Sequence, residues 1–106
     1  MYRPPVSEIA FTLKEVAGLA DVVAQEGAGD LSGDLVDAIL EEAGRFAAEE
    51  IVPLNAVGDR VGARLADGAV TMPPGWKEAY RAWSEGGWNA LTGAPEYGGQ
   101  GLPMML

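Results

Sequence analysis

The sequence predicts an all-α fold, a small helical bundle with an extended N-terminal leader and one short β-hairpin near residues 63–72. Apolar residues in the range 35–54 recur every three or four positions, which is the spacing of one face of an α-helix. A second helix is indicated by Trp76, Tyr80 and Trp83, whose spacing places three rings on one helix face. An Asp-Gly pair between two short apolar runs is typical of a hairpin.

The N-terminal leader is expected to begin extended over residues 1–11, because its Pro-Pro pair keeps neighbouring residues out of the α region. Thr12 is the predicted N-cap of the first helix, since Glu15 follows three residues later as in a capping box. Phe11 and Val16 occupy the two positions of a hydrophobic staple. The first helix is therefore predicted to start directly after Thr12.

This first helical segment is expected to be short. Gly18 interrupts its apolar spacing, and glycine weakens a helix interior, so two short helices are predicted on either side of it. The polar, glycine-containing run at residues 25–30 buries nothing and should end the segment.

The main helix is predicted over residues 35–54, with Ser32 or Asp34 as its cap. One face should be buried, while charged residues at i+4 spacing cover the opposite side. Phe46 is expected to fill the space left by small neighbours, and Phe46→Ala to cost roughly 3 to 5 kcal/mol if the ring is fully buried. Pro53 should bend or end the helix, with helical structure continuing beyond it. The expected core stripe is Val36, Leu40, Ala43, Ala47, Ile51 and Leu54, reinforced by Leu35 and Ile39.

The second half of the chain opens with the hairpin, whose turn is predicted at Asp67-Gly68. An isolated two-stranded ribbon is only marginally stable, so the hairpin is expected to lean on the helices. The aromatic helix follows Pro74, which suits a first helical turn, and should stop at Gly86-Gly87. A short apolar element at 88–91 comes next.

The glycine-rich turn at 93–101 is the most distinctive motif. Its Gly98-Gly99-Gln100-Gly101 run suggests a phosphate cradle, but such a cradle follows a strand and opens a helix, and neither is predicted here. A tight turn that needs positive φ angles, or a close backbone approach, accounts for the glycines better. Glu96 has no histidine, nucleophile or second carboxylate near it in sequence, which argues against a general base. Residues 104–106 resemble the first turn of a further helix.

Composition excludes several classes of function. With 106 residues the chain has the size of one domain, predicted as 1–106 with a leader at 1–30 and a helical core at 31–106. A net charge of −9 argues against nucleic acid as a partner. The absence of Cys and His removes thiolate chemistry and the commonest metal ligand. No apolar run is long enough for membrane insertion, so a cytoplasmic protein is expected.

Two further side-chain patterns have an ordinary structural interpretation. The aromatic stripe of Trp76, Tyr80 and Trp83 could stack on a flavin or a nucleotide, but rings at this spacing are more often core residues. Most of the 16 acidic residues lie at helical-surface spacing, which is typical of a solvated face. Glu41 and Glu42 are adjacent, so they do not form an i, i+4 metal pair. No catalytic, cofactor-binding or metal-binding residue is predicted.

Seven blocks in order along the chain resemble the N-terminal part of flavin-dependent acyl-CoA dehydrogenases. The likeness is greatest to the longer bacterial members, which begin with an extra N-terminal segment. The blocks are 5–11 (PVSEIAF), 39–47 (ILEEAGRFA), 53–55 (PLN), 58–60 (GDR), 75–81 (GWKEAYR), 85–88 (EGGW) and 95–103 (PEYGGQGLP).

The resemblance implies an N-terminal helical domain, a middle β domain and a C-terminal helical bundle that together bind FAD and desaturate an acyl-CoA thioester. Electron-transferring flavoprotein then reoxidises the flavin. The β domain and the bundle, with its catalytic carboxylate, have no counterpart in these 106 residues, so the chain alone is expected to bind no FAD and to be inactive. By this resemblance Tyr97, Gly98, Gly99 and Gly101 would support the substrate cavity.

An alternative remains open beside the enzyme fragment. A freestanding helical domain of this kind would expose the apolar face on which the β domain packs in the full-length family. It could then act as a protein-interaction module or form a homo-oligomer through that face.

Overall fold

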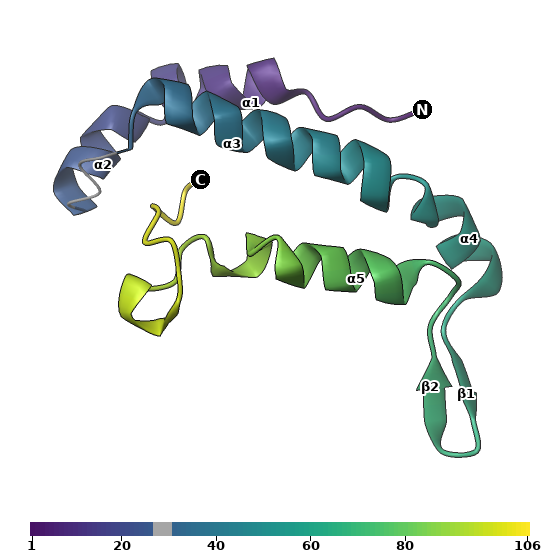
Figure 1. The fold of residues 1–106 in the computed structure, drawn as a ribbon. Helices are drawn as coiled ribbons and strands as arrows, with labels where there is room; N and C mark the ends of the chain where they lie inside the picture. Colours follow the sequence, from purple (N-terminus) through teal and green to yellow (C-terminus); the bar gives the residue numbers. More distant parts are fainter. Residues whose placement is uncertain (27–30) are drawn as a thin grey trace.

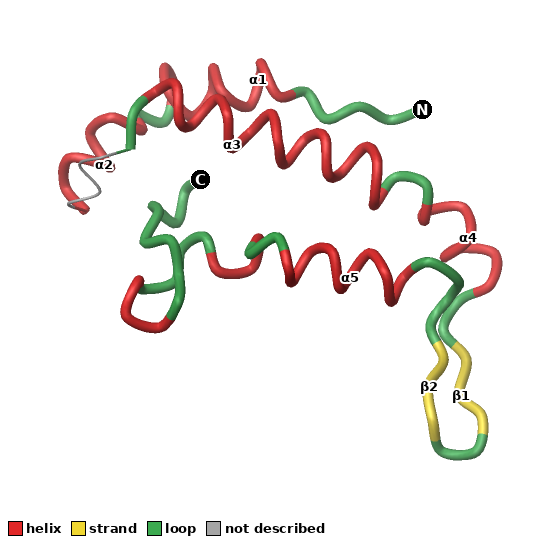
Figure 2. Tube along the Cα trace, viewed as in Figure 1, coloured by secondary structure: helices red, strands yellow, loops and turns green. Residues whose placement is uncertain are grey.

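The computed structural model describes residues 1–26 and 31–106, and it confirms a mostly helical fold with one antiparallel hairpin. In Figure 1, α1 lies along α3 on one side, and α5 runs back beneath α3 on the other. Figure 2 shows the hairpin extending away from both helices. The elements are α1 Val6–Phe11, π-helix η1 Thr12–Val16, α2 Leu19–Glu26, α3 Gly33–Phe46, π-helix η2 Ala47–Ile51, α4 Leu54–Val61, β1 Arg64–Ala66, β2 Ala69–Thr71, α5 Trp76–Glu85, and the 3₁₀-helices η3 Trp88–Ala90 and η4 Pro95–Tyr97.

The first helix starts earlier than predicted. The extended leader ends at Pro5, whose carbonyl accepts the Ile9 amide at 3.0 Å, and the chain is helical from Val6 onward. Proline restricts the residue before it and leaves the residues after it free to be helical, which is why the prediction of extended structure as far as Phe11 was wrong. The predicted N-cap, Thr12, directly follows α1 as the first residue of η1, so the helical stretch is already under way there.

The capping box and the staple therefore do not form. Thr12 has helical backbone angles, and its Oγ1 donates to the Glu8 carbonyl at 2.8 Å. Phe11 and Val16 are both exposed instead of packing together. Once a helix has begun upstream, its own backbone hydrogen bonds satisfy the amides that a cap would have satisfied.

Gly18 divides the N-terminal segment as predicted. It has a φ of +72°, a left-handed conformation that glycine adopts without strain, and α2 begins immediately after it. The turn brings Leu19 against Val36 and Leu40 of α3, and these three residues form the buried core of the N-terminal half. The predicted break at 25–30 lies mostly outside the described residues.

α3 has the predicted cap and the predicted end. The Leu35 amide donates to Ser32 Oγ at 3.1 Å, so Ser32, and not Asp34, is the N-cap. Toward Pro53 the regular pattern gives way to η2, where the Val52 amide bonds to the Ala47 carbonyl at 2.8 Å. Helical structure resumes as α4, since a proline at a first helical turn removes no needed hydrogen bond.

α1 packs closely against α3 at Gly44, which has no side chain. A Cβ at Gly44 would lie 2.6 Å from Val6 Cγ2, so a larger residue would push the two helices apart. The predicted core stripe is buried at Val36 and Leu40 and is only half-buried farther along, and Ile51 is exposed. The packed core is thus confined to the first half of α3.

The hairpin forms where it was predicted, with Leu65 opposite Val70. Its turn residues Asp67 and Gly68 have positive φ angles of 51° and 76°, which suit the right-handed twist of a two-residue hairpin. The expectation that it leans on the helices was wrong. All six strand residues are exposed, and Leu65 is 74% exposed.

The aromatic stripe on α5 is not core. Trp76, Tyr80 and Trp83 are 39%, 70% and 38% exposed, and the buried residue of this helix is Ala79. Spacing correctly predicts that the three rings share a face, but the described elements cover that face only in part. Trp83 packs against Phe46, and a Cβ at Gly58 would lie 2.8 Å from the Trp76 ring, whereas Tyr80 is mostly exposed. Phe46 is half-buried against Trp83, so Phe46→Ala should cost less than the roughly 3 kcal/mol that marks a fully buried phenylalanine.

α3 and α5 meet through an aromatic cluster. The ring centroids of Phe46, Trp83 and Trp88 lie 5.9 to 6.1 Å apart, the range in which aromatic rings attract one another. The whole arrangement is open, with a radius of gyration of 17.0 Å. A compact chain of this length would have about 13 Å. Residues 104–106, predicted as a helical turn, form only a turn.

Candidate functional site

The glycine-rich loop at 93–101 is folded tightly on itself. Gly98 and Gly101 have φ angles of +86° and +65°, a region that residues with a Cβ rarely adopt. A Cβ at Gly99 would lie 2.0 Å from the Gly93 carbonyl oxygen, so two stretches of backbone meet there with no room for a side chain. Both predicted reasons for the glycines, positive φ and close backbone approach, are confirmed.

The amides at the C-terminal end of this loop are engaged within the chain. Five consecutive donors, residues 98 to 102, each bond to a backbone carbonyl at 2.8 to 3.1 Å. The acceptors are carbonyls of residues 90 to 95, which include the first residues of the loop itself. A phosphate cradle needs backbone N–H groups that point outward at the ligand. The loop is therefore a scaffold that fixes the backbone around it.

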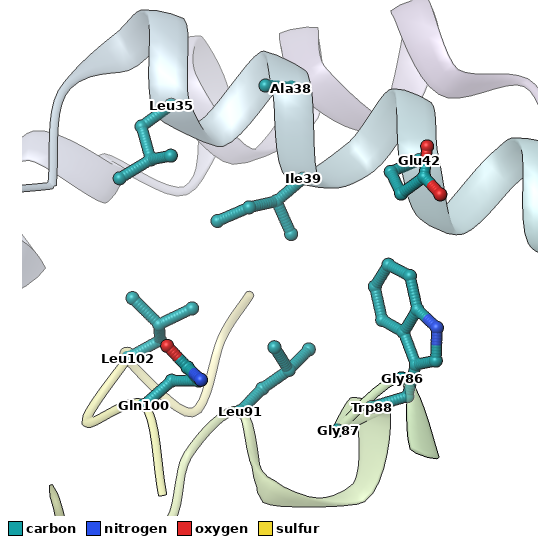
Figure 3. A pocket seen from close by; sticks show the side chains of 10 residues that line it. All are labelled: Leu35, Ala38, Ile39, Glu42, Gly86, Gly87, Trp88, Leu91, Gln100 and Leu102. Atoms are coloured by element: carbon teal, nitrogen blue, oxygen red, sulfur yellow. The ribbon is translucent and has the colours of Figure 1, made fainter. Parts of the chain in front are cut away.

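An apolar pocket of about 390 Å³ lies between α3 and the segment that this loop fixes. Figure 3 shows Leu35 and Ile39 of α3 facing Leu91 and Leu102 across it. The Leu102 amide donates to the Leu91 carbonyl at 2.9 Å, which sets these two side chains next to each other. The remaining lining residues are Ala38, Glu42, Gly86, Gly87, Trp88 and Gln100.

Glu42, whose carboxylate lines the pocket, belongs to an ion-pair network that extends from α3 into η2. Arg45 pairs with Glu42 one turn before it and with Glu49 one turn after it. The hydrogen bond with Glu42 raises the pKa of the exposed Arg45 guanidinium above its usual range. The pocket suits an apolar group better than acid–base chemistry.

The predicted site residues lie beside this pocket and do not line it. Tyr97 is 87% exposed, and Gly98, Gly99 and Gly101 form the loop that fixes Gln100 and Leu102. Within residues 1–26 and 31–106, no group of three or more carboxylates is placed to hold a metal ion. The same part of the chain contains no helix with the length and apolar character that crossing a membrane requires.

Sequence reasoning missed the residues that line the pocket. Leu35 and Ile39 were assigned to the core stripe of α3, although their spacing places them on a face turned away from the buried Val36 and Leu40. Leu91 was noted only as part of a short apolar element. A second apolar face on α3 was the available signal. Its partner segment lies far along the chain and could not be identified from spacing.

No family model matches the chain. A curated protein from Ruegeria pomeroyi, 3-methylmercaptopropionyl-CoA dehydrogenase, is 39% identical over 105 residues. The match covers 99% of this chain and 18% of the relative, so the chain matches a fragment of that enzyme and spans less than a fifth of its length. The relative's name is that of an acyl-CoA dehydrogenase, the family that the sequence blocks resemble.

Proposed function

We propose that this chain is the structural equivalent of the N-terminal helical part of a flavin-dependent acyl-CoA dehydrogenase and has no dehydrogenase activity by itself. The observation that carries the proposal is the 39% identity, which extends over 99% of the chain. Identity of that extent argues for a shared role in a larger enzyme. The substrate would be an acyl-CoA thioester, with electron-transferring flavoprotein as the oxidant of the reduced flavin.

The described residues do not fit FAD. Its pyrophosphate needs several free amides or cations, and the amides of residues 98 to 102, which include the glycine run, each bond to a backbone carbonyl. Arg45, the cation that contacts the lining residue Glu42, also pairs with Glu49. We therefore expect the isolated chain to carry no flavin.

The contribution of the chain would be to the wall of the acyl cavity. The amides of Gly99 and Gly101 bond to carbonyls earlier in the loop and hold it closed, so that Leu102 faces Leu35 across the pocket. A wall built on hydrogen-bonded backbone keeps its shape when an apolar chain slides past it. In this proposal the loop residues position the lining and do not touch the substrate.

A chimera tests the proposal directly. This chain would replace its matching segment in the Ruegeria pomeroyi relative, and the purified chimera would be assayed for bound flavin and for oxidation of 3-methylmercaptopropionyl-CoA. We expect a flavin absorbance band and retained turnover, because the replaced segment shares 39% of its residues. A chimera that folds but lacks both properties would overturn the equivalence.

Two controls complete this test. A chimera that carries Leu40→Asp, which places a charge in the buried core, should lose flavin and activity together. The isolated 106-residue chain should show neither a flavin band nor turnover of any saturated acyl-CoA with an artificial electron acceptor. Yellow protein or measurable turnover from the isolated chain would contradict the proposed inactivity.

In cells we place the protein in the cytoplasm.

A second candidate function is supported by a separate observation. The rings of α5 are exposed, and exposed apolar patches of this kind mark association surfaces. The chain would then be a non-enzymatic module that associates with itself or with another protein. Light scattering after size-exclusion chromatography separates the possibilities. A defined oligomer supports the module, whereas a stable monomer at all concentrations contradicts self-association.

A further inference from the structure

The tip of the hairpin carries an Asp-Gly pair with open space around it. Asp67 and Gly68 are the two central residues of the turn between β1 and β2, and both are exposed. A Cβ at Gly68 would meet no atom of the described chain within 4 Å. The rest of the described fold therefore leaves this turn free to rearrange.

The side chain and the backbone amide of this pair lack partners. Among the described residues, the Asp67 carboxylate takes part in no ion pair and no hydrogen bond. The Gly68 amide lies outside both strands and donates to no carbonyl of a described turn or loop. An aspartate carboxyl and the next amide along the chain can close a five-membered imide ring. Glycine leaves that amide nitrogen uncrowded, because it has no side chain.

The backbone of the turn is close to the geometry that such a ring requires. The ring fixes the aspartate ψ at about −120°, which with a positive φ is the first central residue of a type II′ turn. Asp67 and Gly68 have φ angles of +51° and +76°, the signs of a type I′ turn. Both turn types join the strands of a hairpin. Rotation of the peptide group between the two residues converts one into the other, since Gly68 accepts either sign of φ.

We propose that Asp67 is a site of spontaneous imide formation, through which the chain acquires an isoaspartate at the tip of its hairpin. The Gly68 nitrogen attacks Asp67 Cγ, and the hydroxyl of the neutral carboxyl leaves with the amide proton as one water molecule. A second water molecule then opens the ring. Attack on Cγ restores aspartate, whereas attack on the Asp67 backbone carbonyl carbon leaves the chain running through the side chain. No cofactor or oxidant takes part, so the outcome is independent of the proposed enzyme role.

The other aspartates of the chain are less suited to this reaction. In the sequence, each of them is followed by a residue that has a side chain. Those that the structure describes lie in helices, where backbone angles differ from those of the ring and the following amide belongs to the helical hydrogen-bond pattern. They are Asp21 in α2, Asp34 and Asp37 in α3, and Asp59 in α4. Asp67 thus combines a following glycine with an open turn.

The product would change the hairpin and spare the helices. An isoaspartate adds a methylene group to the backbone of a two-residue loop, so Ala66 and Ala69 would no longer pair in their present register. All six strand residues are exposed, so loss of the ribbon uncovers no core. The isoaspartate can therefore accumulate in a chain whose helical part stays folded.

Ageing of the purified chain in warm, mildly acidic buffer tests the proposal. Trypsin cleavage after Arg64 and Lys77 releases peptide 65–77, in which Asp67 is the one aspartate. We expect this peptide to lose the mass of one water transiently and then to accept methyl groups from a protein isoaspartate methyltransferase. The rate in the intact chain should lie within about ten-fold of the rate in the isolated peptide, because a lone two-stranded ribbon is only marginally stable. An intact chain that stays unmodified while the peptide reacts would overturn the proposal.

The matched control is Arg60→Gly, which places a glycine after the exposed, helical Asp59 and leaves the hairpin unchanged. Modification at residue 67 but not at residue 59 of this variant supports the assigned site. Equal rates at the two residues would show that a following glycine alone selects the site, which would overturn the role of the turn. Hydrogen exchange checks that α4 is still formed. If it is not, Gly68→Ala, which crowds the attacking nitrogen, must slow the reaction at residue 67 in the intact chain.

Discussion

The two halves of this chain use the same kind of apolar pattern with opposite results. In the N-terminal half, Leu19 of α2 covers Val36 and Leu40 of α3, and all three are buried. In the second half, α5 carries larger apolar side chains at equally regular spacing, yet its rings remain exposed. An amphipathic pattern therefore specifies which residues share a face. Whether that face is buried depends on how fully a partner element covers it. Among the described residues the first half provides complete cover, while the α5 rings receive only partial cover from Phe46 and Gly58.

The largest expected effect comes from the core of the first half. Leu40→Ala should reduce the free energy of unfolding by about 2 to 5 kcal/mol, because it leaves a cavity between α2 and α3. Urea denaturation followed by circular dichroism measures the change. The control Leu65→Ala, on the exposed hairpin, should stay within about 0.5 kcal/mol of the parent. Equal effects at the two leucines would remove the contrast between the halves.

The next effect tests whether the backbone contact at Gly99 holds the glycine-rich loop of the second half in place. Gly99→Ala should cost about 1 to 3 kcal/mol, since the new methyl group cannot fit beside the Gly93 carbonyl. Hydrogen exchange at Gln100 and Leu102 should become faster, because their amides bond across this contact. Gly33→Ala, at a glycine without a positive φ and where a Cβ would lie 3.8 Å from Lys14 Nζ, serves as a control in which these two amides keep their protection. Unchanged exchange in Gly99→Ala would show that the loop is held by other contacts.

A smaller effect tests the contribution of the side-chain cap at the start of α3. Ser32→Ala removes the side-chain cap of α3 and should destabilise the chain by about 1 kcal/mol. α5 has no side-chain cap, and Ser84→Ala near its end should be neutral. Chemical denaturation of both variants gives the comparison. If Ser84→Ala lowers the free energy of unfolding as much as Ser32→Ala does, the end of α5 depends on the Ser84 hydroxyl and the cap of α3 is not special.

The smallest effect concerns the ion pair that links η1 to α3. Lys14 Nζ lies 2.6 Å from Asp37 Oδ1, and both side chains are partly exposed. Solvent screening limits such pairs, so a double-mutant cycle with Lys14→Met and Asp37→Asn should give a coupling energy below about 1 kcal/mol. A much larger coupling would indicate that electrostatics, and not the buried leucines, hold the first half together.

Local signals predicted the elements well. The Ser32 cap, the interruption at Gly18, the Asp67-Gly68 turn and the glycine-rich loop all form as expected, because each depends on residues within a few positions of one another. The Thr12 capping box failed for a local reason as well. A helix that starts at Val6 already supplies the hydrogen bonds that the cap would have made.

Burial and the candidate site were less predictable. The pocket joins Leu35 and Ile39 to Leu91 and Leu102, which lie far apart in sequence, so no spacing rule relates them. The exposure of Trp76 and Tyr80 was also missed, since periodicity is the same for a face that is covered and one that is open. Both failures concern tertiary contacts.

The most direct test of the contrast between the halves is hydrogen exchange measured at increasing chain concentration. Amides of α3 around Val36 and Leu40 should be protected to the same degree at every concentration, because their core lies within one chain. Amides of α5 around Tyr80 should start less protected and gain protection as copies associate. Equal and concentration-independent protection of α3 and α5 would contradict the account.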